Sequence, residues 1–405
     1  MSRDNRPVIV HVVHSLEGGG TERTLVALLH AFDPSRFRHA VVTLRAAGSL
    51  SARLPDHVAC RPLVASGRSW STGLRLAQLT RHWGAAVIHA RNTGCWSDAT
   101  GAGLLTPHTR LVLGFHGLET AGPFNQRHRR LARWALLAGA RFTSVSEAGR
   151  RQLRDQARIP TDRITLLRNG VELHSFGQLD EAARKRTRAA FQWDDTTFVV
   201  GTVGSLTPVK GHITLIRAVA RVRQPVPNIR LLIVGDGPQR ASLEQQAQVE
   251  GVGDRVHFLG WREDVSRLMD CMDVYVCSSA SEGMNNALLE AMAAGLPIIA
   301  TDVGDNAAMI RDGVEGQIVK PGSFEAIANT LAIFARSPDL RQRFATAAKT
   351  RANDYDFDEK VRAYEAYYQA LLTVGTTNEK SVPHGRSRSH VVSRSAASVD
   401  RPQRR

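Results

Sequence analysis

The sequence is poor in cysteine and has no long apolar run. Its four cysteines form no CxxC pair in 405 residues, so neither a disulfide framework nor a structural zinc site is expected. The apolar run near the N-terminus is short and is interrupted by His11 and His14. No other stretch is long enough to cross a bilayer, so we expect neither a signal peptide nor a membrane span. These absences predict a cytoplasmic protein.

Acidic residues are outnumbered by basic ones, 38 against 53, which gives a formal net charge of +15. Such an excess suggests nucleic acid or an anionic membrane surface as a partner. The chain has neither a recognition fold nor interleaved stacking aromatics, so no nucleic acid is expected. Basic residues concentrate in the segment 127–133 and in the Ser- and Arg-rich tail, residues 375–405, which is predicted to be disordered. Two interpretations remain: peripheral contact with anionic lipids at the inner face of the cell membrane, at about 1 kcal/mol per basic residue, or a solubilising charge excess.

Apolar runs alternate with helical patterns, which predicts an α/β fold with parallel sheets covered by helices on both faces. The runs fall into two series, so we expect a Rossmann-like domain over residues 1–177 and another over residues 178–355. Two facing doubly wound domains place a ligand cleft at the carboxyl ends of their strands. The strand candidates are 8–13, 40–44, 86–89, 111–115, 142–145, 164–167, 198–204, 231–235, 256–259, 274–278, 298–301 and 317–319.

The segment 281–294, SEGMNNALLEAMAA, is the most informative stretch of the chain. It spaces two carboxylates, Glu282 and Glu290, around a glycine-led turn that opens a helix, so the two can contact different parts of one extended ligand. The N–H groups of residues 283–286 lie at the helix start, where unpaired donors and the helix dipole favour anionic groups. On this spacing alone, a surface helix with two solvated glutamates is the better interpretation.

The order of several further motifs changes that interpretation. The segment 282–290 resembles the EX7E stretch of the retaining family 4 glycosyltransferases, and other landmarks of that family follow in the expected order. These are Gly18-Gly19-Gly20 with Glu22, Phe115-His116-Gly117, Val145-Ser146-Glu147, Asn169-Gly170-Val171-Glu172, Val203-Gly204-Ser205 with Lys210-Gly211, and Val234-Gly235-Asp236-Gly237-Pro238. The resemblance implies the GT-B fold, in which a last helix crosses back to the first domain. Residues 356–374 carry a suitable apolar stripe.

The resemblance also implies a set of site residues. Lys210 would stabilise the charge that accumulates on a departing diphosphate. His116 would hydrogen-bond the sugar or a phosphate and act on protons near neutral pH, while Glu282 would bind the donor sugar and Glu290 the ribose. Thr21 is expected to cap the helix after the glycine loop. The other expected donor contacts are Gly19, Gly20, Ser205, Gly235, Gly283, Met284, Asn285 and Asn286.

Three features depart from the family pattern or need an explanation. Ser205 stands where the family usually has a basic residue, so either an arginine elsewhere substitutes for it or the site is weaker. Met284 and Asn285 replace the commoner Phe-Pro pair, a change that affects sugar choice without removing N–H donors. Asp354, Asp356 and Asp358 resemble a metal-binding DxD motif but are interpreted as helix-start residues, so neither a metal nor another cofactor is expected. Those three aspartates precede or open the last helix.

Together these motifs predict a retaining glycosyltransferase that moves a sugar from a UDP- or GDP-sugar to a glycan or lipid-linked acceptor in cell-surface polysaccharide biosynthesis. Retention is possible through a covalent intermediate or through same-face substitution, and the resemblance favours the second. Two alternatives remain: a sugar-nucleotide epimerase of the same architecture, and a non-catalytic nucleotide-sugar-binding subunit, which Ser205 motivates.

Overall fold

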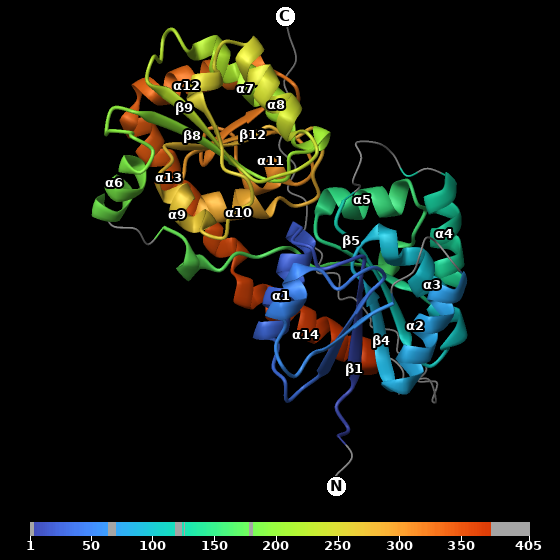
Figure 1. Ribbon diagram of the computed structural model, residues 1–405. Coiled ribbons are helices and arrows are strands. Elements are labelled where there is room, and N and C mark those ends of the chain that lie inside the picture. The colour runs from blue at the N-terminus through green and yellow to red at the C-terminus, as the bar shows by residue number, and fades with distance from the viewer. Residues whose placement is uncertain (1–3, 64–69, 118–123, 125, 178–180, 374–405) are drawn as a thin grey trace, which may run out of the picture.

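The computed structural model describes residues 4–63, 70–117, 124, 126–177 and 181–373, which fold around two parallel sheets (Figure 1). The first sheet has the order β3-β2-β1-β4-β5-β6-β7 and the second the order β10-β9-β8-β11-β12-β13. The strands are β1 Val8–Val13, β2 Arg38–Thr43, β3 Ala59–Pro62, β4 Ala85–Ala90, β5 Arg110–Phe115, β6 Arg141–Ser144, β7 Ile164–Leu166, β8 Phe198–Val203, β9 Ile229–Val234, β10 Val256–Phe258, β11 Val274–Cys277, β12 Ile298–Thr301 and β13 Gly316–Val319.

Helices alternate with these strands and cover both faces of each sheet. They are α1 Gly20–Ala31, α2 Trp70–His82, α3 Trp96–Leu105, α4 Gln126–Leu137, α5 Glu147–Asp155, α6 Glu181–Ala189, α7 His212–Val222, α8 Arg240–Val249, α9 Val265–Asp270, α10 Asn286–Ala293, α11 Asn306–Met309, α12 Phe324–Arg336, α13 Pro338–Ala352 and α14 Phe357–Thr373. This alternation is the doubly wound pattern that the sequence predicts.

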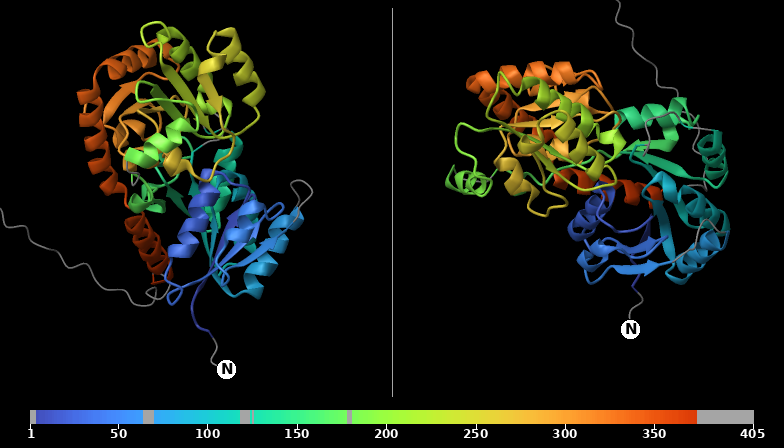
Figure 2. Two further views of the ribbon diagram at one scale, coloured as in Figure 1. Left: turned by 60° about the vertical axis from the view of Figure 1, so that its left-hand side comes forward. Right: turned by 45° about the horizontal axis from the view of Figure 1, so that its top comes forward.

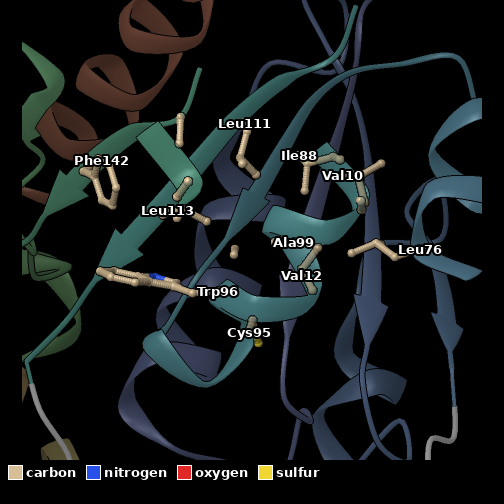
Figure 3. Packing of buried hydrophobic residues seen from close by; sticks show 14 of the residues in the cluster. Val10, Val12, Leu76, Ile88, Cys95, Trp96, Ala99, Leu111, Leu113 and Phe142 are labelled. Atoms are coloured by element: carbon tan, nitrogen blue, oxygen red, sulfur yellow. The ribbon is translucent and has the colours of Figure 1, made fainter. Parts of the chain in front are cut away.

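One face of the first sheet packs against α2, α3, α4 and α5. Its strand residues are small or branched, so the helices approach closely. Trp96 fills the centre of this layer, and its Nε1 donates a hydrogen bond to the carbonyl of Gly114 at 2.9 Å. Figure 3 shows the packing of Val10, Val12, Leu76, Ile88, Cys95, Trp96, Ala99, Leu111, Leu113 and Phe142.

The other face of the first sheet packs against α1 and α14. The apolar stripe of α14 is buried there, with Tyr364 and Tyr368 at most 1% exposed. The chain thus returns to the first domain from the second, as Figure 2 shows for the C-terminal helix. The two crossing segments pair at Val171, whose N–H donates to Tyr355 at 2.8 Å and whose carbonyl accepts from Phe357 at 3.1 Å.

The second sheet is also covered on both faces. Its strands pack against α7, α8 and α12 on one face and against α9 and α10 on the other. Helix α13 touches both clusters through Phe344 and Ala348. Because both faces are covered, the central strands β8, β11 and β12 are mainly apolar and buried rather than alternating.

The predicted α/β fold of two doubly wound sheets with a returning C-terminal helix is confirmed. The exact domain boundaries stay a prediction, and the tail, residues 375–405, lies outside the described residues. The strand β3 was not expected, because it is a short edge strand that is largely exposed and ends in Pro62. Within the described part of the chain, no helix combines the length and apolar character that a bilayer span needs.

Candidate functional site

Lys210 and Glu282 form an ion pair at the carboxyl end of the second sheet. Lys210 ends the turn after β8, and its Nζ lies 2.6 Å from Glu282 Oε1. The same oxygen accepts hydrogen bonds from Ser279 Oγ at 2.6 Å and Asn285 Nδ2 at 3.2 Å. Burial opposes the charge of Lys210, but the Glu282 carboxylate outweighs it and raises the pKa of the ammonium group. The two residues therefore act as one charge-balanced unit.

The start of α10 lies directly beside this ion pair. Asn285 caps the helix, with its Oδ1 accepting from the N–H of Leu288 at 3.2 Å. Gly283 packs so closely on the carbonyl of His116 that a Cβ there would clash with it, which brings the turns of the two domains together. Met284 lines a cavity of about 260 Å³ together with Asp305 and Tyr355, and its Sδ accepts a hydrogen bond from the N–H of Asn169 at 3.2 Å.

The glycine loop of the first domain faces the start of α10. Helix α1 begins at Gly20, so Thr21 lies inside it and the expectation that Thr21 caps the helix is wrong. Asn286 Nδ2 donates to Thr24 Oγ1 at 3.1 Å, which links the two domains across the cleft. In the described part of the chain, Asn286 Oδ1 is buried without a hydrogen-bond partner. This oxygen is available to accept a hydrogen bond from a ligand hydroxyl.

Glu290 lies farther along α10 and is partly buried. Burial raises the pKa of this carboxyl group to about 7, and Arg23 of α1 opposes the rise. The guanidinium of Arg23 also stacks on Trp261, 5.1 Å from the ring centre. Trp261 follows Gly260, whose carbonyl accepts a hydrogen bond from Gly235 at 2.8 Å. A carboxylate, an aromatic face and a cation from the other domain thus surround this end of the cleft.

Ser205 carries no charge into the site. Its side chain is exposed, and its Oγ lies 3.5 Å from Thr207 Oγ1. The neighbouring His212 is buried, and burial lowers its pKa to about 4, so it is neutral near pH 7. Neither residue replaces the missing cation, which leaves Arg23 as the basic side chain nearest to Glu290 from the opposite domain.

His116 follows β5, and its carbonyl lies against Gly283 of the turn before α10. Burial lowers its pKa to about 3, and the positive charges of Arg91 and Lys360 lower it further. The imidazole is therefore neutral near pH 7, and its expected action on protons stays a prediction. A neutral ring can still donate or accept a hydrogen bond.

Asp305 is a functional candidate that the sequence analysis missed. Its carboxylate accepts hydrogen bonds from the N–H groups of Glu147 at 2.7 Å and Ala148 at 2.8 Å, the first residues of α5 in the other domain. Its own N–H donates to Gly283 at 3.1 Å. The carboxylate therefore meets the positive end of the α5 dipole and holds the donor-side turn to the first domain. The sequence did hold one indication of this role, because Asp305 lies just beyond β12 and so falls at the carboxyl edge of the sheet.

Comparison with known families agrees with this arrangement. Residues 18–175 match the model of Glycosyltransferase Family 4, and residues 183–351 match that of Glycosyl transferases group 1. The chain belongs to the family 4 glycosyltransferases. Both models together include every predicted site residue, from Gly19 in the first to Glu290 in the second.

Individual members of the family are similar to different parts of this chain. EpsD of Bacillus subtilis is 29% identical over 53% of the chain and 56% of its own length. The lipopolysaccharide core biosynthesis glycosyltransferase LpsE of Rhizobium meliloti is 36% identical over 36% of the chain and 42% of its own length. The matches thus span about half the length of these relatives. The crystal structure of HepE from Anabaena with UDP and glucose has a TM-score of 0.79 at 22% identity, covering 90% of this chain and all of that one.

No group of His, Cys, Asp or Glu side chains suited to a metal ion occurs among the described residues of this family 4 chain. Two of the three aspartates near the last helix have partners for their carboxylates. Asp354 pairs with Arg351, and Asp356 Oδ1 accepts from the N–H of Asp358 at 3.0 Å. These contacts fit residues that start a helix.

Proposed function

We propose that this chain transfers a hexose-type unit from a UDP- or GDP-sugar to a glycan or lipid-linked acceptor, with retention and without a metal. The observation that carries the proposal is the Lys210–Glu282 pair at the start of α10. A diphosphate placed there would meet both a fixed cation and the N–H groups of residues 283–286. The carboxylate of Glu282 would at the same time accept hydrogen bonds from the sugar hydroxyls.

The proposed reaction is a same-face substitution. The bond between the anomeric carbon and the diphosphate oxygen breaks, the acceptor oxygen bonds to that carbon from the same face, and its proton moves to the departing phosphate oxygen. Lys210 would stabilise the growing charge of the leaving group. The neutral His116 would orient the sugar by a hydrogen bond, because a neutral imidazole has one N–H donor and one nitrogen acceptor.

Arg23 would supply the positive charge that Ser205 lacks. It comes from the opposite domain and faces the end of the cleft where Glu290 and Trp261 lie. Glu290 would bind the ribose hydroxyls, and Trp261 would border the base. A cation contributed by the first domain would act only when the domains are close, so donor binding and closure would be linked.

An exposed face of α4 supports action at a membrane in cell-surface polysaccharide assembly. Four arginines, at positions 127, 129, 130 and 133, are exposed on this helix. Trp134 and Leu137 lie beside them with 60% and 77% of their surface exposed. Basic residues next to exposed Trp and Leu suit the surface of an anionic bilayer. We therefore propose peripheral contact at the cytoplasmic face.

Vesicle binding tests the membrane contact. Vesicles with anionic lipid should sediment the protein, and vesicles of neutral lipid should not. Replacing the four arginines of α4 with glutamine should weaken binding, since each removed charge contributes about 1 kcal/mol. Equal binding to both vesicle types, or no loss in the variant, would leave a purely solubilising role for these charges.

A thermal-shift screen against UDP- and GDP-sugars tests the donor assignment. The cognate donor should raise Tm in a concentration-dependent way, while Lys210→Ala should lose most of the shift. Incubation of that donor with and without candidate acceptors then separates the activities. A transferred sugar with unchanged anomeric configuration supports the proposal, whereas isomerised donor without acceptor identifies an epimerase.

A cellular test addresses the non-catalytic alternative that Ser205 motivates. If Glu282→Ala and Lys210→Ala leave cellular glycan production intact while deletion of the gene abolishes it, the chain acts as a binding subunit. Loss of glycan in both variants, at normal protein levels, supports catalysis.

A further inference from the structure

Arg91 is a buried arginine that has no counter-charge among the described residues. It follows β4 at the carboxyl edge of the first sheet, and only 2% of its surface is exposed. Its guanidinium lies 5.0 Å from the ring centre of Tyr364 on α14. Within the described part of the chain, its Nε and Nη2 are buried without a hydrogen-bond partner, and no carboxylate forms an ion pair with it. A charge in that state is costly unless a partner arrives.

A second cation, Lys360 of α14, belongs to the same group. It is 5% exposed, and its Nζ contacts Asn169 Oδ1 at 3.4 Å. Among the described residues it has no acidic partner. Burial lowers its pKa to about 7, and the charge of Arg91 contributes to the change. Two cations thus share one buried region.

The position of this pair is that of a ligand site. The strand order of the first sheet reverses between β1 and β4, and ligands of doubly wound sheets bind outside the carboxyl ends of strands at such a point. Arg91 lies there, with its N–H bonded to Val12 of β1 at 2.9 Å. The next residue, Asn92, adds a buried Oδ1 without a partner among the described residues.

Contacts between the two domains lie close to this pair. Asn169, which Lys360 contacts, donates its Nδ2 to the carbonyl of Met284 at 3.2 Å. Gly283 packs on the carbonyl of His116, whose ring is affected by the charges of both Arg91 and Lys360. A ligand would reach the pair from the cleft when the domains separate.

We propose that Arg91 and Lys360 bind a phosphate group carried by the acceptor. Two adjacent cations match the double charge of a phosphate better than the single charge of a carboxylate, and the guanidinium fork fits phosphate oxygens. Asn92 Oδ1 would accept a hydrogen bond from an acceptor hydroxyl. This inference rests on the proposed function, because it names the acceptor class for that reaction.

Thermal denaturation with UDP present tests the proposal, because UDP occupies the donor site. The probes are inorganic phosphate, hexyl phosphate and acetate. Both phosphates should raise the Tm of the wild type, with hexyl phosphate at lower concentrations, while acetate should not. In Arg91→Met the apparent Kd for phosphate should rise by about tenfold or more, and Arg91→Lys should retain part of the affinity.

Arg110→Met is the matched control, since Arg110 is exposed at the opposite end of the neighbouring strand β5. It should leave the phosphate shift unchanged. Without ligand, Arg91→Met should be at least as stable as the wild type, because an uncompensated charge has been removed. The UDP shift should persist in every variant. If the wild type shows no UDP shift, GDP replaces UDP in the assay, and a wild type that shifts with neither nucleotide would contradict the donor assignment instead.

Several results would overturn the phosphate site. They are an unchanged phosphate shift in Arg91→Met, a loss of stability in that variant without ligand, or no shift with either phosphate in the wild type. A shift with inorganic phosphate but not with hexyl phosphate would mark a free-anion site and reject the assignment to the acceptor.

Discussion

The carboxyl edges of the two sheets differ in how their cations are balanced. At the second sheet, the ammonium group of Lys210 contacts a carboxylate that two further donors also hold. At the first sheet, Arg91 and Lys360 are more deeply buried, and the described residues offer them no carboxylate. The two edges face each other across one cleft, so the difference concerns two halves of a single site.

The difference indicates how each half meets its ligand. The proposed donor half is charge-balanced without a ligand, so a diphosphate bound there would share Lys210 with Glu282. The proposed acceptor half carries excess positive charge. An anionic ligand would therefore offset the free-energy cost of burying these unpaired charges. His11 and His89 lie opposite each other on neighbouring strands, and His11 Nε2 contacts His39 Nδ1 at 3.0 Å, so three buried histidines extend the polar region of the first sheet.

Among the expected effects, removal of the Glu282 carboxylate should cause the largest loss of activity and stability. Glu282→Ala leaves Lys210 without its partner, so transfer should fall by about a hundredfold or more, and unfolding should become easier by about 2–4 kcal/mol. Initial rates and urea unfolding measure the two effects. Glu244→Ala, on the exposed side of α8, should change neither. Wild-type rate and stability in Glu282→Ala would show that the pair is incidental.

Acid should destabilise the first domain through its buried histidines. Burial and Arg91 lower the pKa of His39 to about 3, whereas an unfolded histidine titrates near 6.5. The unfolded chain therefore binds more protons below pH 6.5, and stability falls as the pH drops from about 6.5 towards 3. This residue alone should cost about 2 kcal/mol at pH 5.

The variant His39→Gln does not titrate and isolates that contribution. Urea unfolding at pH 5 and pH 7 should show a smaller acid loss in this variant than in the wild type. His82→Gln, in an exposed position of α2, is the control and should keep the full loss. An identical pH dependence in His39→Gln and the wild type would mean that His39 is protonated in the folded protein.

Asp305 should stabilise the contact between the two domains. Asp305→Asn keeps the shape of the side chain but removes the charge that faces the start of α5, so the free energy of unfolding should fall by about 1–2 kcal/mol. Asp302→Asn, an exposed neighbour, should have little effect. If both variants unfold at the same urea concentration as the wild type, the α5 contact contributes no stability.

The smallest expected effect is the pH dependence of donor affinity. Glu290 has a pKa of about 7 in the free protein, and its ionised form is the better acceptor for ribose hydroxyls. Affinity for a nucleotide sugar should therefore rise about tenfold from pH 6 to pH 8. Calorimetric titration checks this, and Glu290→Gln should bind weakly with no such slope. A slope that persists in Glu290→Gln would assign it to another group.

The sequence could predict those elements whose signal is local. Buried parallel strands such as Val8–Val13 are continuous apolar runs, and the Glu282–Glu290 segment carries its helix start in its own residues. The strand β3 escaped prediction because pairing with β2, and not its own composition, makes it a strand. Its residues have little apolar character.

The missed site residues depend on contacts between distant segments. Asp305 lies 158 positions from Glu147, whose N–H it binds, and no local pattern records that pairing. The pKa of His116 likewise depends on Arg91 and Lys360, which come from other elements. For Arg91 a partial signal existed, because it lies two residues beyond the predicted strand 86–89 and therefore near the carboxyl edge of the sheet.

A crystal structure with the cognate nucleotide sugar tests the central claim most directly. The account predicts the diphosphate at the N–H groups of residues 283–286 and within hydrogen-bond distance of Lys210, the ribose on Glu290 and the sugar beside Glu282. A donor bound elsewhere, away from these three side chains, would contradict it.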